Sequence, residues 1–92
     1  MPVRWTKPAA DDLTQICDFT EERFGKAQAR RAALALHDAA DSLGRFPFRG
    51  RVGRKATTRE LVVVGYPFLI VYRLRDKTVE ILRILHGAQK WP

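Results

Sequence analysis

Arg59, Arg83 and His86 are the side chains of this sequence best suited to act on a phosphodiester. Guanidinium groups can hold a phosphate and stabilise the charge of a transition state. A histidine can serve as a general base near neutral pH. No metal-ligand pattern accompanies the three residues, so the chemistry would be metal-independent. RNA would then be the substrate, because its own 2′-hydroxyl can act as the nucleophile.

Each of these residues also has a structural interpretation. Arg83 falls among apolar neighbours, where a guanidinium needs a ligand or a partner. It could instead face solvent, or form an ion pair with Glu60 or Glu80. His86 could be a hydrogen-bonded residue at the end of a strand that positions the C-terminus. We expect Arg59 to lie near Arg83 if the C-terminal strands pair in sequence order.

The strongest charge feature is residues 44–59, GRFPFRGRVGRKATTR, which we call the basic segment. It has a net charge of +6 against +7 for the whole chain, whereas residues 1–43 sum to −1 and residues 60–92 to +2. Loops often collect arginines simply because they are exposed. Glycines interrupt this run and allow close backbone approach, which favours an anion-binding loop. The candidate contacts with nucleic acid or another target are Arg49, Arg51, Arg54 and Lys55.

Composition excludes several classes of protein. The single cysteine, Cys17, cannot form an intramolecular disulfide, and no Cys/His grouping has zinc-finger spacing. Phosphate loops, dinucleotide fingerprints and Ser/His/Asp arrangements are absent, so we expect no metal and no small-molecule cofactor. The longest apolar run, Leu61–Val64, is too short to span a bilayer. The N-terminus lacks the apolar stretch of a signal peptide, which predicts a cytoplasmic protein.

Hydrophobic periodicity predicts one α+β domain over residues 1–92. A short strand at Val3–Thr6 precedes two helices, the first capped by Thr6 and ending near Gly25, the second ending at Gly44. Their apolar faces indicate an antiparallel helical hairpin. Three strands joined by tight turns follow. The predicted order is β-α-α-β-β-β, with an antiparallel sheet packed against the hairpin and strands at Arg59–Val64, Phe68–Leu74 and Thr78–His86.

Strict alternation along the last strand fixes the expected direction of its side chains. It places Arg83 on one face with Val79, Ile81 and Leu85, and His86 on the other. Beyond this strand, Trp91 could stack on a base or dock the tail as a hydrophobic plug.

Five ordered segments together resemble the RelE/ParE superfamily of toxins from bacterial type II toxin–antitoxin systems. These segments are WTKPAADDLTQICDFTEERFG, FPFRGRVGR, TRELVV, FLIVYRL and VEILRILHGAQKWP. The resemblance covers essentially the whole chain. It implies a toxin that inhibits bacterial growth, is neutralised by a cognate antitoxin and can contribute to plasmid stabilisation. An acidic, partly apolar antitoxin segment is expected on the sheet face and the basic segment.

The resemblance leaves two targets open. ParE-like members poison DNA gyrase without catalysis, and the regular helical hairpin, the LHGAQ ending and the absence of a C-terminal tyrosine favour this alternative. RelE-like members are ribosome-dependent mRNA endoribonucleases. In that case Arg59, Arg83 and His86 would correspond to the catalytic set. A third alternative is an inactive member that retains only antitoxin binding.

Overall fold

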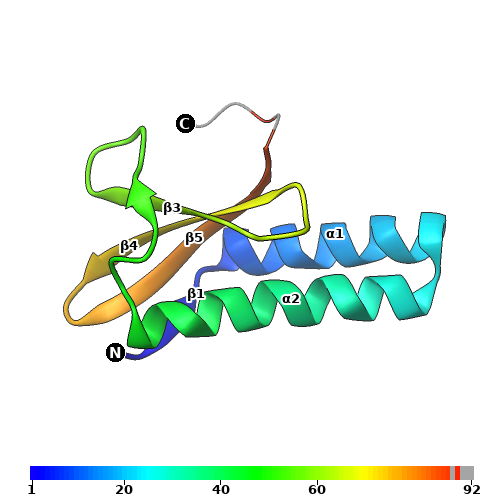
Figure 1. The fold of residues 1–92 in the computed structure, drawn as a ribbon, viewed down its shortest axis with the longest axis horizontal. Coiled ribbons are helices and arrows are strands. Elements are labelled where there is room, and N and C mark those ends of the chain that lie inside the picture. Colours follow the sequence, from blue (N-terminus) through cyan, green and yellow to red (C-terminus); the bar gives the residue numbers. More distant parts are fainter. Residues whose placement is uncertain (88, 90–92) are drawn as a thin grey trace.

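The computed structural model describes residues 1–87 and Gln89, which form two helices and five strands (Figure 1). The predicted α+β class and the order β-α-α-β-β-β are confirmed, with one short strand added inside the basic segment. The prediction for Trp91 lies outside the described residues. In chain order the elements are β1 (Val3–Trp5), α1 (Lys7–Phe24), α2 (Lys26–Arg45), β2 (Arg51–Val52), β3 (Thr58–Val62), β4 (Phe68–Arg75) and β5 (Thr78–His86).

The sheet is mixed, which corrects the expectation of an antiparallel sheet. Its strand order is β1-β5-β4-β3-β2, and β1 pairs with β5 in parallel while the other neighbours are antiparallel. Tight turns force antiparallel pairing only on strands that follow each other in sequence. The helical hairpin separates β1 from the other strands, so β1 can join the edge of the sheet in the parallel direction.

Local signals in the sequence set the ends of the helices. The Thr6 hydroxyl accepts a hydrogen bond from the backbone N–H of Ala9 (3.4 Å), and Pro8 lies in the first turn, where its missing N–H costs no helical bond. Gly25 adopts a φ of 89° between the helices, and its N–H donates to the carbonyl of Glu21. The chain therefore reverses at Gly25, and α1 and α2 form the predicted hairpin.

The core lies between this hairpin and one face of the sheet. The end of the hairpin where α1 turns into α2 projects past the strands (Figure 1). Neither helix of the described residues is long and apolar enough to cross a membrane. The fully buried core residues come from both layers and include Ala9, Leu36, Ala40 and Leu43 of the helices and Ile70, Tyr72, Val79 and Ile81 of the strands.

A bulge in β5 reverses the predicted direction of its last side chains. Tyr72 pairs with Ile81 but Val71 pairs with Arg83, so Leu82 has no residue opposite it. Paired residues of neighbouring strands share a face. Arg83 therefore shares the register of Val71 and not the face of Ile81, which belongs to the core cluster. The predicted placement of Arg83 on one face with Val79 and Ile81 is therefore wrong, because the extra residue shifts the alternation of side chains along β5 by one.

Tyr72 fixes the turn between α2 and β2 from inside the core. Its buried hydroxyl donates to the carbonyl of Pro47 (2.7 Å) and accepts from the N–H of Gly50 (2.9 Å). A Cβ atom at Gly50 would lie 2.6 Å from that hydroxyl oxygen, so the close approach requires glycine. Burial raises the pKa of Tyr72, with the Gly50 N–H and the Arg59 charge opposing it, so the hydroxyl stays protonated and can donate.

Replacing Tyr72 with phenylalanine should lower the free energy of unfolding by about 1–3 kcal/mol, because a buried N–H and a carbonyl lose their partner. Urea denaturation of the two proteins measures the difference. Tyr66→Phe is the matched control, since the Tyr66 hydroxyl makes no hydrogen bond within the described residues. Equal losses in both variants would show that the hydroxyl does not hold the turn.

Candidate functional site

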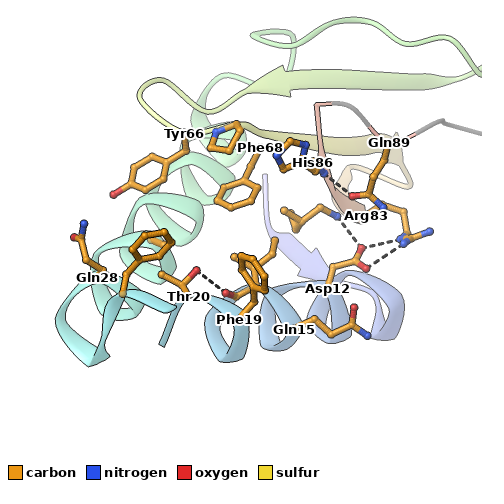
Figure 2. A pocket seen from close by; sticks show the side chains of 15 residues that line it. Asp12, Gln15, Phe19, Thr20, Gln28, Tyr66, Phe68, Arg83, His86 and Gln89 are labelled. Atoms are coloured by element: carbon orange, nitrogen blue, oxygen red, sulfur yellow. Dashed lines mark hydrogen bonds and ion pairs between the residues drawn. The ribbon is translucent and has the colours of Figure 1, made fainter. Parts of the chain in front are cut away.

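A groove lies between the helical hairpin and the end of the sheet where β3 turns into β4 (Figure 2). Its volume is about 610 Å³. Helix α1 contributes one wall, α2 the floor at the closed end of the hairpin, and β4, β5 and the turn before β4 the opposite wall. The lining residues are Asp12, Gln15, Ile16, Phe19, Thr20, Phe24, Gln28, Ala32, Tyr66, Pro67, Phe68, Arg83, Ile84, His86 and Gln89.

One end of the groove is apolar and aromatic. Phe19 and Phe24 on α1 both line the groove and are 55% and 66% exposed. Across the groove, the rings of Tyr66 and Phe68 stack with centroids 6.2 Å apart. The helical stripe continues beyond the strands that it could pack against, so these rings remain available to another molecule.

The other end of the groove is held by Asp12. Its carboxylate accepts two hydrogen bonds from the Arg83 guanidinium (2.7 and 3.1 Å) and one from the backbone N–H of Ile84 (2.9 Å). Strand β1 ends at Trp5, so the edge of β5 beyond Ile81 has no neighbouring strand. Asp12 occupies that edge. The partner of Arg83 is therefore Asp12, and neither Glu60 nor Glu80, and this hydrogen bonding raises the pKa of Arg83.

His86 lies at the rim of the groove. Its ring meets Phe68 edge-on with centroids 6.4 Å apart, and its backbone N–H donates to the side-chain oxygen of Gln89 (2.6 Å). The groove thus brings His86 and Arg83 to the same end (Figure 2). The second contact agrees with the structural interpretation of His86 as a residue that positions the following chain.

Arg59 is placed elsewhere. It pairs with Tyr72, whereas Arg83 pairs with Val71, and consecutive residues of a strand point to opposite faces. The Arg59 guanidinium donates to the carbonyl of Gly50 (2.7 Å) and does not line the groove. The expectation that Arg59 and Arg83 lie together is therefore wrong for their side chains, although their strands are arranged as predicted.

The arginines of the basic segment have different partners. Arg51 and Arg54 form ion pairs with Glu60, at 3.2 and 3.5 Å, and the Arg54 N–H also donates to this carboxylate (3.2 Å). Arg49 instead donates to the hydroxyl of Ser42 (3.0 Å). The backbone carbonyl of Lys55 accepts from Thr58, closing the turn before β3. Of the predicted contact residues, Arg51 and Arg54 are therefore paired with a carboxylate, whereas Arg49 is bound to an uncharged acceptor.

Glu60 organises the basic segment. Its side chain is only 2% exposed. Burial alone would raise its pKa, but the Arg54 N–H, the Arg51 hydrogen bond and the two guanidinium charges outweigh burial and hold the pKa below its ordinary value. Glu80 is a second such carboxylate, paired with Arg73 at 2.7 Å and with Arg4, and its pKa is lowered by these two hydrogen bonds.

Acid should therefore destabilise the protein through these two glutamates. A carboxylate with a lowered folded pKa contributes stability above the unfolded value of 4.5, and that contribution is lost as pH falls through the folded pKa. Chemical denaturation at a series of pH values should show stability falling below pH 4.5. Glu60→Gln should flatten this dependence, whereas substitution of the exposed Glu22 by glutamine should not. Parallel curves for the wild type and Glu60→Gln would contradict the assignment.

Sequence reasoning missed Asp12 and the aromatic groove. The signal for the groove was present, since the apolar stripe of α1 extends to Phe24, past the length that three short strands can cover. The role of Asp12 could not be predicted from the local sequence, because its partners Arg83 and Ile84 lie 71 and 72 positions away. In the described part of the chain, no group of three or more His, Cys, Asp or Glu residues is arranged to hold a metal ion.

The comparisons with known proteins all lead to toxins or toxin–antitoxin systems. Residues 3–91 match the family described as the ParE toxin of the type II toxin–antitoxin system parDE. Toxin RelE2 of Caulobacter vibrioides is 48% identical over 87 residues, which cover 95% of this chain and 96% of that protein.

Two solved structures share the fold. A chain of the chromosomal ParDE toxin–antitoxin system from P. aeruginosa superposes with a TM-score of 0.86 at 28% identity, covering 94% of this chain and 95% of that chain. A chain of the RelBE2 toxin–antitoxin complex from Mycobacterium tuberculosis has a TM-score of 0.67 at 26% identity, covering 92% and 95%.

Proposed function

Because this chain belongs to the ParE toxin family of type II toxin–antitoxin systems, we propose that it arrests growth as a non-catalytic poison of DNA gyrase. The observation that supports this target is the dispersal of the nuclease candidates. Arg83 is bound to Asp12 in the groove, and Arg59 is held by the carbonyl of Gly50 outside it. A phosphodiester could not contact Arg59, Arg83 and His86 together without rearrangement of these pairs.

A ribosome-dependent endoribonuclease is the second candidate. It is favoured by a relative named Toxin RelE2, which is 48% identical to this chain, and by the placement of Arg83 and His86 at one end of the groove. In this case a phosphate would have to compete with Asp12 for the Arg83 guanidinium. The two candidates predict different molecular damage after induction.

The decisive experiment measures both activities on the same purified toxin. We expect inhibition of gyrase supercoiling or trapped gyrase–DNA cleavage complexes at micromolar toxin, and intact mRNA on translating ribosomes. Ribosome-dependent mRNA cleavage without any effect on gyrase would exclude the gyrase proposal and support the second candidate.

The variant His86→Gln separates the candidates inside cells. Glutamine keeps a polar side chain at the rim of the groove but cannot act as a general base. A gyrase poison should therefore arrest growth within about twofold of the wild type, whereas loss of a general base typically lowers a reaction rate 10²- to 10⁴-fold. Viable counts after induction from a tightly controlled promoter give the readout. Full loss of toxicity, with normal soluble protein, would favour catalysis.

We further propose that the groove is the docking site of the cognate antitoxin. Exposed aromatic rings lining a concave surface are typical of sites that receive the apolar face of a helix. Structural relatives of this chain come from ParDE and RelBE2 toxin–antitoxin systems. The sequence alone predicts the antitoxin on the sheet face and the basic segment. Under this proposal the hairpin takes a direct part in antitoxin binding.

A further inference from the structure

We propose that the turn between α2 and β2 binds single-stranded nucleic acid. We call this surface the Phe-Arg patch and define it by Arg45, Phe46, Phe48, Arg49 and Arg59. It lies at the C-terminal end of α2 (Figure 1), whereas the groove extends from Asp12 toward the closed end of the hairpin, and the two share no residue. The proposal does not depend on whether gyrase or the ribosome is the target.

The two aromatic rings of the patch are largely exposed to solvent. Phe46 is 59% and Phe48 67% exposed. Both rings line one hollow together with Arg45 and Arg49. Two large apolar side chains beside two cations on a turn are unusual for a surface that contacts only water.

The turn that presents these rings is held in place. Tyr72 fixes it through the carbonyl of Pro47 and the N–H of Gly50, as described above. From outside, the Arg59 guanidinium donates to the Gly50 carbonyl and lies 5.0 Å from the centre of the Phe48 ring. A ligand stacking on Phe48 would therefore meet a surface whose conformational entropy is already restricted.

Among the described residues, the charge of the patch is not neutralised by a carboxylate. Arg49 and Arg59 donate to a hydroxyl and a carbonyl, which are uncharged acceptors. By contrast, Arg51, Arg54 and Arg83 are paired with carboxylates. Among the described residues no ion pair involves an arginine of the patch. The uncompensated positive charge of the basic segment therefore concentrates beside the two phenylalanines.

Single-stranded nucleic acid matches this combination of groups. Its phosphates complement guanidinium groups, and its unpaired bases can stack on aromatic rings, whereas the bases of a duplex are covered by their neighbours. An acidic peptide would complement the same arginines, but its carboxylate side chains offer no flat surface that stacks on the rings. The rings and the charges together therefore favour a single strand.

The test measures binding of fluorescein-labelled oligo-dT by fluorescence anisotropy with the full chain. We expect affinity that falls steeply with salt and exceeds the affinity for a duplex of the same length. Phe46→Ala and Phe48→Ala should each weaken binding roughly tenfold. Phe48→Leu, which keeps apolar area but removes the ring, should lose a similar factor. Both rings are exposed, so the fold should tolerate these changes, and circular dichroism checks it.

Two control variants lie on the exposed surface of α2, outside the patch and the groove. Arg30→Ala removes one charge and Leu34→Ala removes one exposed apolar side chain. Both should change the affinity less than twofold. Equal affinity for duplex and single strand, with no effect of the phenylalanine substitutions, would overturn the proposal, as would absent binding. Poly-glutamate binding as tight as oligo-dT, with the same dependence on Phe46 and Phe48, would overturn it in favour of an acidic protein partner.

Discussion

Substitution of Asp12 by alanine should lower the free energy of unfolding by about 2–4 kcal/mol. The change removes three hydrogen bonds at once, two from the Arg83 guanidinium and one from the N–H of Ile84. It leaves a partly buried charge without a counter-charge and an unpaired N–H at the edge of the sheet. Since a domain of this size has a total stability of about 5–14 kcal/mol, the loss is a large fraction of it.

Asp11 is the matched control for this experiment. It is adjacent in α1 and exposed, and within the described part of the chain its ion pair is with Lys7, one helical turn away at 3.0 Å. Asp11→Ala should therefore change the unfolding free energy by about 0.5 kcal/mol or less. Urea denaturation followed by circular dichroism measures both variants.

Two further variants separate the contributions of charge and hydrogen bonding. Asp12→Asn keeps an oxygen that can accept from the N–H of Ile84 but loses the charge, so it should be less destabilising than alanine. Arg83→Met removes the guanidinium and leaves Asp12 bound to the N–H of Ile84. An Asp12→Ala variant as stable as Asp11→Ala would mean that this pair does not hold the edge of β5.

The parts of the fold that the sequence predicted are those fixed by neighbouring residues. Thr6 caps α1 through a contact three positions away, and Gly25 reverses the chain through its own backbone conformation. The strand turns likewise depend on residues next to one another. Such features can be predicted because the interacting groups lie within one turn of the chain.

The parts that were missed depend on residues distant in sequence. The parallel pairing of Val3 with Val79 brings together the two ends of the chain. The bulge at Leu82 changes the face of every later residue in β5, and nothing in the residue types near it signals an extra residue. Arg83 was correctly identified as needing a partner, but the choice of Asp12 is made by how α1 packs beside the open edge of β5.

This difference explains why the chemistry of the site was harder to predict than the fold. Arg59, Arg83 and His86 were selected by residue type, and residue type cannot say on which face a side chain lies. The structure brings Arg83 and His86 to the groove and leaves Arg59 with Phe48 in the Phe-Arg patch. A set of candidates that suggested one nuclease site thus falls on two separate surfaces.

The double substitution Phe19→Ala and Phe24→Ala should weaken antitoxin binding roughly 100-fold or more, if the antitoxin docks in the groove as proposed. Removal of a buried aromatic anchor typically costs an interface about 2 kcal/mol or more, and the costs of two such removals are not strictly additive. Both rings are more than half exposed in the free chain. Their removal should therefore cost the fold little, apart from the contact between Phe19 and the Arg23 guanidinium at 4.9 Å.

The measurement is titration calorimetry of the full toxin with its cognate antitoxin, together with rescue of growth by co-expressed antitoxin. The double variant should stay toxic and escape neutralisation, because in this proposal the groove binds the antitoxin and a different surface engages the target. Leu34→Ala, which removes an exposed side chain of α2 outside the groove, should be neutralised normally. A double variant that loses toxicity while still binding antitoxin tightly would reverse the assignment, making the groove the surface that engages the target.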